Sequence, residues 1–186
     1  IEASLKSKYL DSVVVSTDCA KIAEVAKRFG AEVPFIRPGV IASDTTSTID
    51  VVKHCIDFYK SKNKEYTHLL LLQPTSPLRG EEDIDRSIDL LLNKNAKGVY
   101  SVCETEHSPL WSNTLPKDNS FDDFLRPELN GKRSQDLPKY YRLNGSIYLV
   151  EIKELLNMGS LHFISPSYAY VMDRKTSIDI DEDLDF

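Results

Sequence analysis

The chain has no apolar run long enough to cross a bilayer and no secretory signal. It also has few cysteines. Cys19, Cys55 and Cys103 are odd in number, far apart and set in apolar or strand-like surroundings. This pattern does not suggest a disulfide framework or a zinc site. We therefore expect reduced thiols in a cytoplasmic protein that does not associate with membranes.

The chain also lacks clustered positive charge. The formal net charge is −6 and the chain has no long run of Lys or Arg, whereas nucleic-acid binding requires a basic face. We therefore expect no nucleic-acid partner. An acidic enzyme can still bind a nucleotide through a few placed cations and a metal ion. The sequence contains no G-x-G-x-x-G or Walker loop and no Ser/His/Asp or Cys/His order that would suggest a covalent mechanism.

Short β-branched or apolar runs alternate with amphipathic segments. The 186 residues suffice for one sizeable α/β domain. The alternation predicts βαβ units, a Rossmann-like, mostly parallel sheet and helices on both faces. Strands are expected at 11–16, 33–36, 68–72, 98–103, 144–150 and 168–172. The pattern loosens over about 108–139, where Pro, Asn and Asp predict an excursion from the sheet.

Two carboxylates stand one residue apart near the end of the chain. On an extended segment, Asp179 and Asp181 would point to the same side, with Ile178 and Ile180 facing a core. Convergent carboxylates repel each other unless a cation lies between them, and Mg²⁺ prefers such oxygen ligands. A solvated acidic chain end is the alternative.

Other polar clusters follow predicted strands, where ligands bind in open α/β sheets. The Gln73 amide follows four leucines and could contact a sugar or a base edge; alternatively, it holds a turn together. Arg37 could bind a phosphate, or it could pair with Asp44. The hydroxyls of 45–48 could instead cap the next helix.

A further candidate binding surface lies around Asn144, which follows two tyrosines and an arginine. These side chains could line a concave polar surface. The tyrosines also have a purely structural explanation, because aromatic residues favour strands.

Together these blocks resemble the acylneuraminate cytidylyltransferases, in the family's order and over almost the whole chain. The matching stretches are VVVSTD, FIRPGVIASDTTSTID, LLLLQPTSPLR, EHSPLWSN, QDLPKYYRLNGSIY and SIDIDEDLDF. The resemblance implies the nucleotide-diphospho-sugar transferase fold. It implies an enzyme that joins CTP to a nine-carbon 2-keto sugar acid and releases pyrophosphate, with Mg²⁺ as cofactor. It also implies a homodimer in which the excursion reaches the partner.

The resemblance assigns roles to individual residues. Asp179 and Asp181 would be the catalytic and metal-binding residues, with Asp181 or a bound water helping to deprotonate the sugar hydroxyl. The nucleotide-binding residues would be Arg37, Asp44, Ser47 and Thr48. The substrate-binding residues would be Gln73, Arg133, Asn144, Tyr148 and Phe163, the last approaching the sugar site of the partner.

The sequence also departs from the family's pattern. The family's first strand and its phosphate-gripping loop are absent, so we expect residues 1–186 to be a single cytidylyltransferase domain that is incomplete at its N-terminus. Ser134 stands where many members carry a second Arg, and Trp111 where some carry a Lys. These changes leave the sugar open, with legionaminic or pseudaminic acid as alternatives. A non-catalytic homologue that binds a sugar or nucleotide, or drives oligomerisation, is the alternative from another functional class. Transfer to an eight-carbon sugar acid is a further one.

Overall fold

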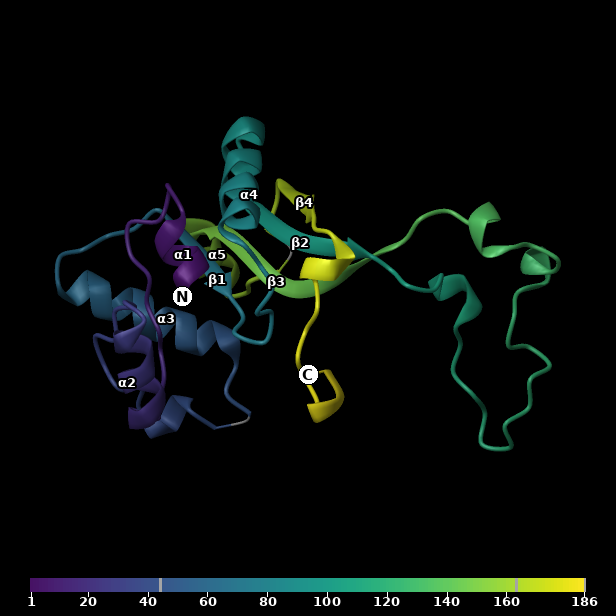
Figure 1. The fold of residues 1–186 in the computed structure, drawn as a ribbon, viewed down its shortest axis with the longest axis horizontal. Coiled ribbons are helices and arrows are strands. Elements are labelled where there is room, and N and C mark those ends of the chain that lie inside the picture. The colour runs from purple at the N-terminus through teal and green to yellow at the C-terminus, as the bar shows by residue number, and fades with distance from the viewer. Residues whose placement is uncertain (44, 163, 186) are drawn as a thin grey trace.

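A computed structural model describes residues 1–43, 45–162 and 164–185. Its centre is a four-stranded sheet in the order β1-β3-β2-β4 (Figure 1). The strands are β1 (His68–Leu72), β2 (Gly98–Glu104), β3 (Tyr141–Glu151) and β4 (Ser167–Val171). β3 is antiparallel to both β1 and β2, while β4 pairs with β2 in parallel. Three strands therefore share one direction and β3 runs against them.

Helices cover both faces of this sheet, as predicted. On one face α3 (Thr48–Ser61) and α5 (Ile152–Met158) pack with Val150 of β3. On the other face α4 (Glu81–Lys94) packs with Val99 and Leu149. The leucines of β1 alternate between the two faces, which explains why this strand is a continuous apolar run.

The N-terminal part differs from the prediction. Residues 11–16 and 33–36 were expected to be strands, but the structure has only an isolated parallel bridge between Val14 and Glu32. The backbone hydrogen bonds of Val13 and Val15 go to Glu32 alone, so this stretch does not join the sheet. A β-rich sequence cannot form a ladder without a neighbouring strand on which to pair.

The helix α2 (Ala20–Arg28) is followed by Gly30, whose φ is +90°. The larger apolar side chains of this helix do not face the protein interior. Ile22, Val25 and Phe29 are about half exposed, whereas the small residues Ala23 and Ala26 are buried. Small side chains allow the helix to pack closely on that side, which leaves the larger ones in solvent.

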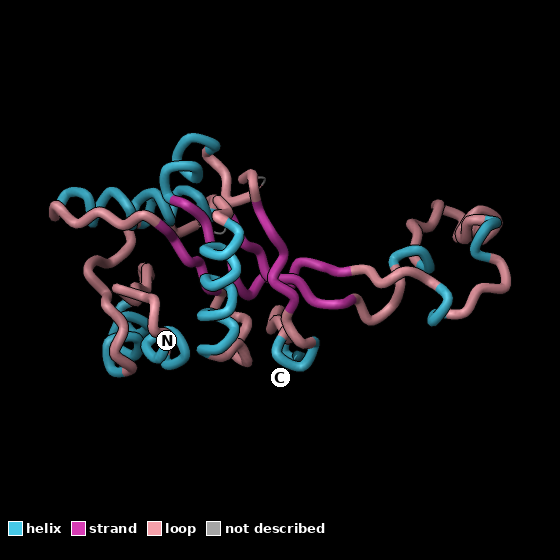
Figure 2. The backbone as a smooth tube through the Cα atoms, turned by 90° about the horizontal axis from the view of Figure 1, so that it is seen from above, coloured by secondary structure: helices cyan, strands magenta, loops and turns pink. Residues whose placement is uncertain are grey.

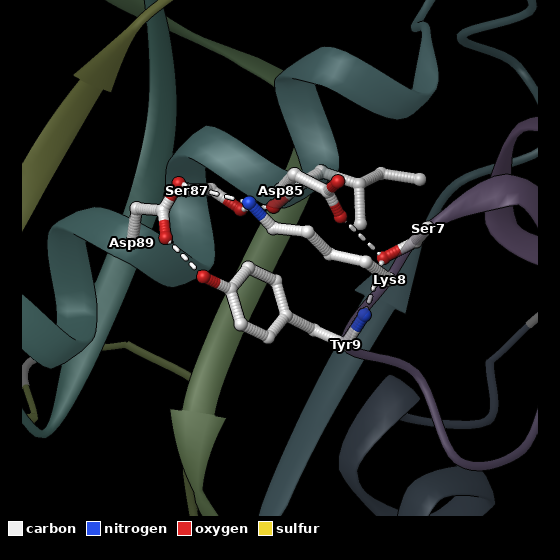
Figure 3. A network of polar contacts seen from close by, with 7 residues as sticks. Ser7, Lys8, Tyr9, Asp85, Ser87 and Asp89 are labelled. Atoms are coloured by element: carbon white, nitrogen blue, oxygen red, sulfur yellow. Dashed lines mark hydrogen bonds and ion pairs between the residues drawn. The ribbon is translucent and has the colours of Figure 1, made fainter.

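The segment after α1 (Glu2–Lys6) is attached to α4 by polar contacts (Figure 3). The Ser7 hydroxyl donates to Asp85 Oδ1 at 2.6 Å, and the Tyr9 hydroxyl donates to Asp89. Lys8 Nζ lies 3.9 Å from Asp89 Oδ2. These contacts join the first residues of the chain to the helix that covers one face of the sheet.

Residues 105–140, between β2 and β3, form an irregular segment. Between β2 and β3 the chain forms three short 3₁₀ turns, at Pro109–Trp111, Pro127–Leu129 and Ser134–Asp136. The ribbon and the tube views both show it projecting well beyond the sheet (Figures 1 and 2). Within the described residues, no helix is both long and apolar enough to cross a membrane.

Candidate active site at the carboxyl ends of β1, β2 and β4

The sheet register brings Gln73 beside Gly145. Leu72 at the end of β1 pairs with Ile147 of the antiparallel β3, so the residue after Leu72 lies next to the residues before Ile147. A Cβ atom placed on Gly145 would lie 2.4 Å from Gln73 Oε1. Two segments that are distant in sequence therefore meet at the end of the sheet where ligands bind in this class of fold.

Asp179 reaches the same point from the chain that follows β4. The Cβ placed on Gly145 would lie 3.2 Å from Asp179 Oδ2. Asp179 Oδ1 is buried and has no hydrogen-bond partner among the described residues. A buried carboxylate oxygen without a partner is costly unless a ligand supplies the missing interaction.

Gly145 permits this close approach for two reasons. Its φ is +72°, in the left-handed region that residues with a side chain rarely adopt. It also lacks the atom that would overlap with Gln73. A glycine inside a strand often marks such a close contact, and this was the signal in the sequence that could have identified Gly145 as a site residue.

Tyr148 also lies beside Asp179. Burial raises the pKa of the Tyr148 hydroxyl, and the Asp179 charge raises it further. The ring contacts His162 edge to face at a centroid distance of 5.7 Å, and Tyr100 at 6.2 Å. The Tyr148 ring is thus held in a cluster with aromatic rings from β2 and from the chain after α5.

Arg79 joins two backbone segments of the candidate site through hydrogen bonds. One of its Nη atoms donates to the Ser146 carbonyl at 2.8 Å and to the Gln73 carbonyl at 3.3 Å. Burial lowers the pKa of its guanidinium, which Asp83 partly offsets. The Arg79 side chain therefore links the end of β1 to β3, next to the contact between Gln73 and Gly145.

Asn144 was expected to bind substrate, but the structure buries its side chain. It is 1% exposed, and its amide is used by protein neighbours: Nδ2 donates to Ser177 Oγ at 2.8 Å, and Oδ1 accepts from Ser101 Oγ at 2.5 Å. It is therefore part of the framework beneath the site and does not line a wall open to solvent.

The acidic segment is less regular than expected. Residues 177–181 form no strand, and Ile178 is 43% exposed, so the expectation that it faces a core is wrong. Asp181 is exposed, and its backbone N–H donates to Asp185 Oδ2 at 2.8 Å. A hydrogen bond from the Ile180 N–H to the Thr75 carbonyl, at 2.8 Å, holds this segment to the loop after β1.

Of the expected nucleotide-binding residues, Ser47 and Thr48 lie at the start of α3. Arg37 pairs with Asp18, Nη to Oδ1 at 3.1 Å, and its N–H donates to the Thr17 carbonyl. Asp44 lies outside the described residues, so the alternative pairing of Arg37 with it stays a prediction. Thr48 is the first residue of α3.

Ser47 is the N-cap of α3. Its hydroxyl accepts from the Asp50 N–H at 3.3 Å and donates to Asp50 Oδ2 at 2.6 Å. This is the structural use that the sequence left open. The hydroxyl at this position satisfies a backbone donor that the helix cannot satisfy itself.

Removing that cap should destabilise the helix measurably. We expect Ser47→Ala to lower the free energy of unfolding by about 1 kcal/mol, and Ser47→Asp to restore most of it because aspartate also caps. Urea unfolding of the three proteins measures this. Identical unfolding free energies for wild type and Ser47→Ala would contradict the capping role. A raised KM for CTP in the stable Ser47→Asp variant would indicate an additional contact with the nucleotide.

One expected sugar-binding residue, Arg133, is not brought to the candidate site in this chain. Arg133 lies on the projecting segment, where its Nε pairs with Asp136 Oδ2 at 3.1 Å. That segment projects well beyond the sheet (Figure 2). Phe163 lies outside the described residues.

The donor set fits a divalent ion bound together with a substrate. Within the described ranges, no group of three or more His, Cys, Asp or Glu side chains could hold a metal ion by itself. Mg²⁺ is commonly bound by one or two carboxylates plus substrate phosphates. The unpartnered Asp179 Oδ1 suits that mode of binding.

The sequence and the fold both have relatives among known proteins. A family model described as cytidylyltransferase matches residues 1–184. CMP-N,N'-diacetyllegionaminic acid synthase of Legionella pneumophila is 33% identical over 192 residues, which cover the whole chain and 79% of that protein. Pseudaminic acid cytidylyltransferase of Campylobacter jejuni is 31% identical over 188 residues, covering the whole chain and 80% of that protein. N-acylneuraminate cytidylyltransferase of Escherichia coli is 30% identical, and the chain covers 43% of it.

Solved structures support the fold. A CMP:2-keto-3-deoxy-manno-octonic acid synthetase complexed with CTP has a TM-score of 0.61 at 14% identity, with 92% of this chain and 76% of that chain covered. A 4-diphosphocytidyl-2C-methyl-D-erythritol synthase from Anaerococcus prevotii has a TM-score of 0.60 at 12% identity, with 99% and 84% covered. At these identities the likeness concerns the fold alone. With the family model matching nearly every residue, the chain belongs to the cytidylyltransferase family.

Proposed function

We propose that this protein transfers CMP from CTP to a nonulosonic acid, with Asp179, Gly145, Gln73 and Tyr148 at the centre of the site. The observation that carries the proposal is the buried Asp179 Oδ1, which has no hydrogen-bond partner among the described residues and belongs to a side chain that meets Gln73 across Gly145. The family supports the class of reaction. The first relatives, named for legionaminic and pseudaminic acid, support the class of acceptor.

The chain's own residues would bind and orient the two substrates. Asp179 would hold Mg²⁺ with help from Asp181, and a metal ion supplies neutralisation of charge on the phosphates as the α-phosphate is attacked. Arg37, Asp44, Ser47 and Thr48 would line the nucleotide side. Gln73 could then donate to, and accept from, polar groups of the sugar, while the Tyr148 ring excludes water from one side. Rate enhancement would come mainly from positioning and fixed charge.

A homodimer would complete the sugar site. Leu115, Phe121 and Leu125 on the projecting segment are 42–62% exposed, an apolar surface that a second copy could cover. Arg133 on the same segment, and Phe163, would then approach the partner's site. The reaction would take place in the cytoplasm. A molar mass from light scattering tests the dimer, and a monomer at catalytic concentration would contradict this part of the proposal.

Pyrophosphate release tests the function. The full-length protein with CTP, Mg²⁺ and legionaminic, pseudaminic or N-acetylneuraminic acid should release pyrophosphate with at least one sugar. An eight-carbon acid serves as the control for acceptor length and should be a much poorer substrate. No release with any nine-carbon acid would contradict the proposal, and calorimetric binding of CTP without turnover would favour the non-catalytic homologue.

A further inference from the structure

A chain of three buried polar side chains lies directly beneath the proposed site. Ser101, Asn144 and Ser177 are each 1% exposed. They come from β2, β3 and the segment after β4, so this series of hydrogen bonds links the middle of the sheet to the acidic segment. Buried polar networks of this kind fix one arrangement of the backbone when every member is satisfied.

The first link depends on an irregularity in the sheet. The pairing of β2 with β3 shifts register between Tyr100 and Val102, which leaves Ser101 at the irregularity. The Ser101 hydroxyl there accepts from the Ile147 N–H at 2.7 Å and donates to Asn144 Oδ1 at 2.5 Å. A bulge that redirects a side chain in this way is a common device next to active sites.

The second link fixes the orientation of the Asn144 amide. Its Oδ1 accepts from Ser101 Oγ and, at 3.3 Å, from the Ser146 N–H. Because both are donors, the amide nitrogen must face the other way, toward Ser177 Oγ at 2.8 Å. Rotating the amide by 180° would place its N–H₂ group against these donors.

The third link is Ser177 itself. Its hydroxyl accepts from Asn144 Nδ2 and donates to the Asp173 carbonyl at 2.7 Å. Asp179 follows two residues later, and the Ile180 N–H is bonded to the Thr75 carbonyl. Asp179 is thus held between an anchor on β3 and an anchor on the loop that carries Gln73.

We propose that Ser177 is a positioning residue, and that the hydrogen-bond chain from Ser101 through Asn144 to Ser177 fixes the Asp179 carboxylate against Gly145 and beside Gln73. The inference rests on the proposed function for its catalytic consequence. It goes beyond that function because none of the three residues touches a substrate. The same residue pair, Asn144 and Gly145, provides both the anchor for Ser177 and the surface on which Asp179 rests, so loss of the anchor is transmitted directly to the carboxylate.

The test compares Ser177→Ala with a matched control, Ser87→Ala. Ser87 is fully buried, and its hydroxyl donates to the Ile84 carbonyl at 2.7 Å within α4. Both variants lose one buried serine hydroxyl bonded to a carbonyl. Ser101→Ala serves as a second variant, because it disturbs the chain from its other end without touching the acidic segment.

Hydrogen exchange measures the positioning without reference to activity. We expect amide exchange over 178–182, including the Ile180 N–H, to be faster in Ser177→Ala and Ser101→Ala than in wild type. The control Ser87→Ala should leave that segment unchanged. Unchanged exchange in a folded Ser177→Ala protein would overturn the inference, whatever the activity of the protein.

Mn²⁺ binding, followed by electron paramagnetic resonance in the presence of CTP, measures the consequence for the metal site. The Mn²⁺ Kd should rise about 10- to 100-fold in Ser177→Ala, the usual effect of losing a residue that orients a metal ligand, and stay unchanged in Ser87→Ala. An unchanged Kd alongside faster exchange would overturn the claim that the chain acts on the metal ligand. Failure of wild type itself to bind Mn²⁺ or release pyrophosphate would instead contradict the proposed function, and the exchange data would still decide the positioning.

Discussion

Asp179→Asn is expected to reduce kcat/KM for pyrophosphate release by at least about 100-fold, since the carboxylate would lose its hold on the metal at the reacting phosphate. The variant should nevertheless fold as well as wild type. Among the described residues Asp179 Oδ1 has no hydrogen-bond partner, so the substitution breaks no such bond there, and removal of the buried charge costs no stability. We expect a free energy of unfolding within about 0.5 kcal/mol of wild type, or higher.

Urea unfolding and steady-state kinetics of the same samples measure both effects. Asp173→Asn is a suitable control because Asp173 lies on the same segment. Its side chain caps a 3₁₀ turn by accepting a hydrogen bond from the Lys175 N–H, and asparagine can accept the same bond. The control should retain activity. Wild-type activity in Asp179→Asn would remove the metal assignment, while a large loss of stability would show that Asp179 is a structural residue.

Gly145→Ala is expected to affect both stability and activity. Alanine at a φ of +72° costs about 1–3 kcal/mol. Its methyl group would also displace Gln73 and Asp179, because the Cβ position lies 2.4 Å from Gln73 Oε1. A misplacement of about 1 Å at a reacting centre can cost about 100-fold in rate, and we expect a loss of at least that size.

Gly159→Ala separates the two effects. Gly159 has a similar φ of +64° at the end of α5, but a Cβ there would meet nothing within 4 Å. This control should lose stability by a similar amount, about 1–3 kcal/mol, because the backbone strain is similar, and it should keep its activity. Equal activity in the two folded glycine variants would contradict the claim that the approach of Gln73 and Asp179 across Gly145 matters to catalysis.

Much of the sheet could be predicted because its residues obey local patterns. The four leucines of β1 are apolar on both faces and form a strand covered on both faces. The helix α3 begins at a serine cap, and α4 begins with three acidic residues. Each of these signals depends on neighbours within one or two turns of the chain.

The errors arise where tertiary pairing overrides pattern. Residues 11–16 are β-branched, yet they find only Glu32 to pair with. The alternation of Asp179 with Ile178 predicted a core-facing Ile178, but residues 177–181 form no strand and the alternation of faces does not apply. Sequence spacing cannot show whether an extended segment has a partner.

The site was predicted in its components and not in its contacts. Gln73, Tyr148 and Asp179 were identified, and the structure brings them together. The close approach across Gly145 depends on the antiparallel direction of β3, which the expectation of a mostly parallel sheet did not specify. Asn144 was identified as well, but its burial against Ser101 and Ser177 makes it a framework residue.

The position of the metal tests the central claim most directly. Crystals of the protein with CTP and Mn²⁺ should give an anomalous difference peak within coordination distance of an Asp179 carboxylate oxygen, with the nucleotide phosphates on its other side. A well-occupied Mn²⁺–CTP complex elsewhere on the molecule, with Asp179 unliganded, would contradict the proposal that the ends of β1, β2 and β4 form the active site.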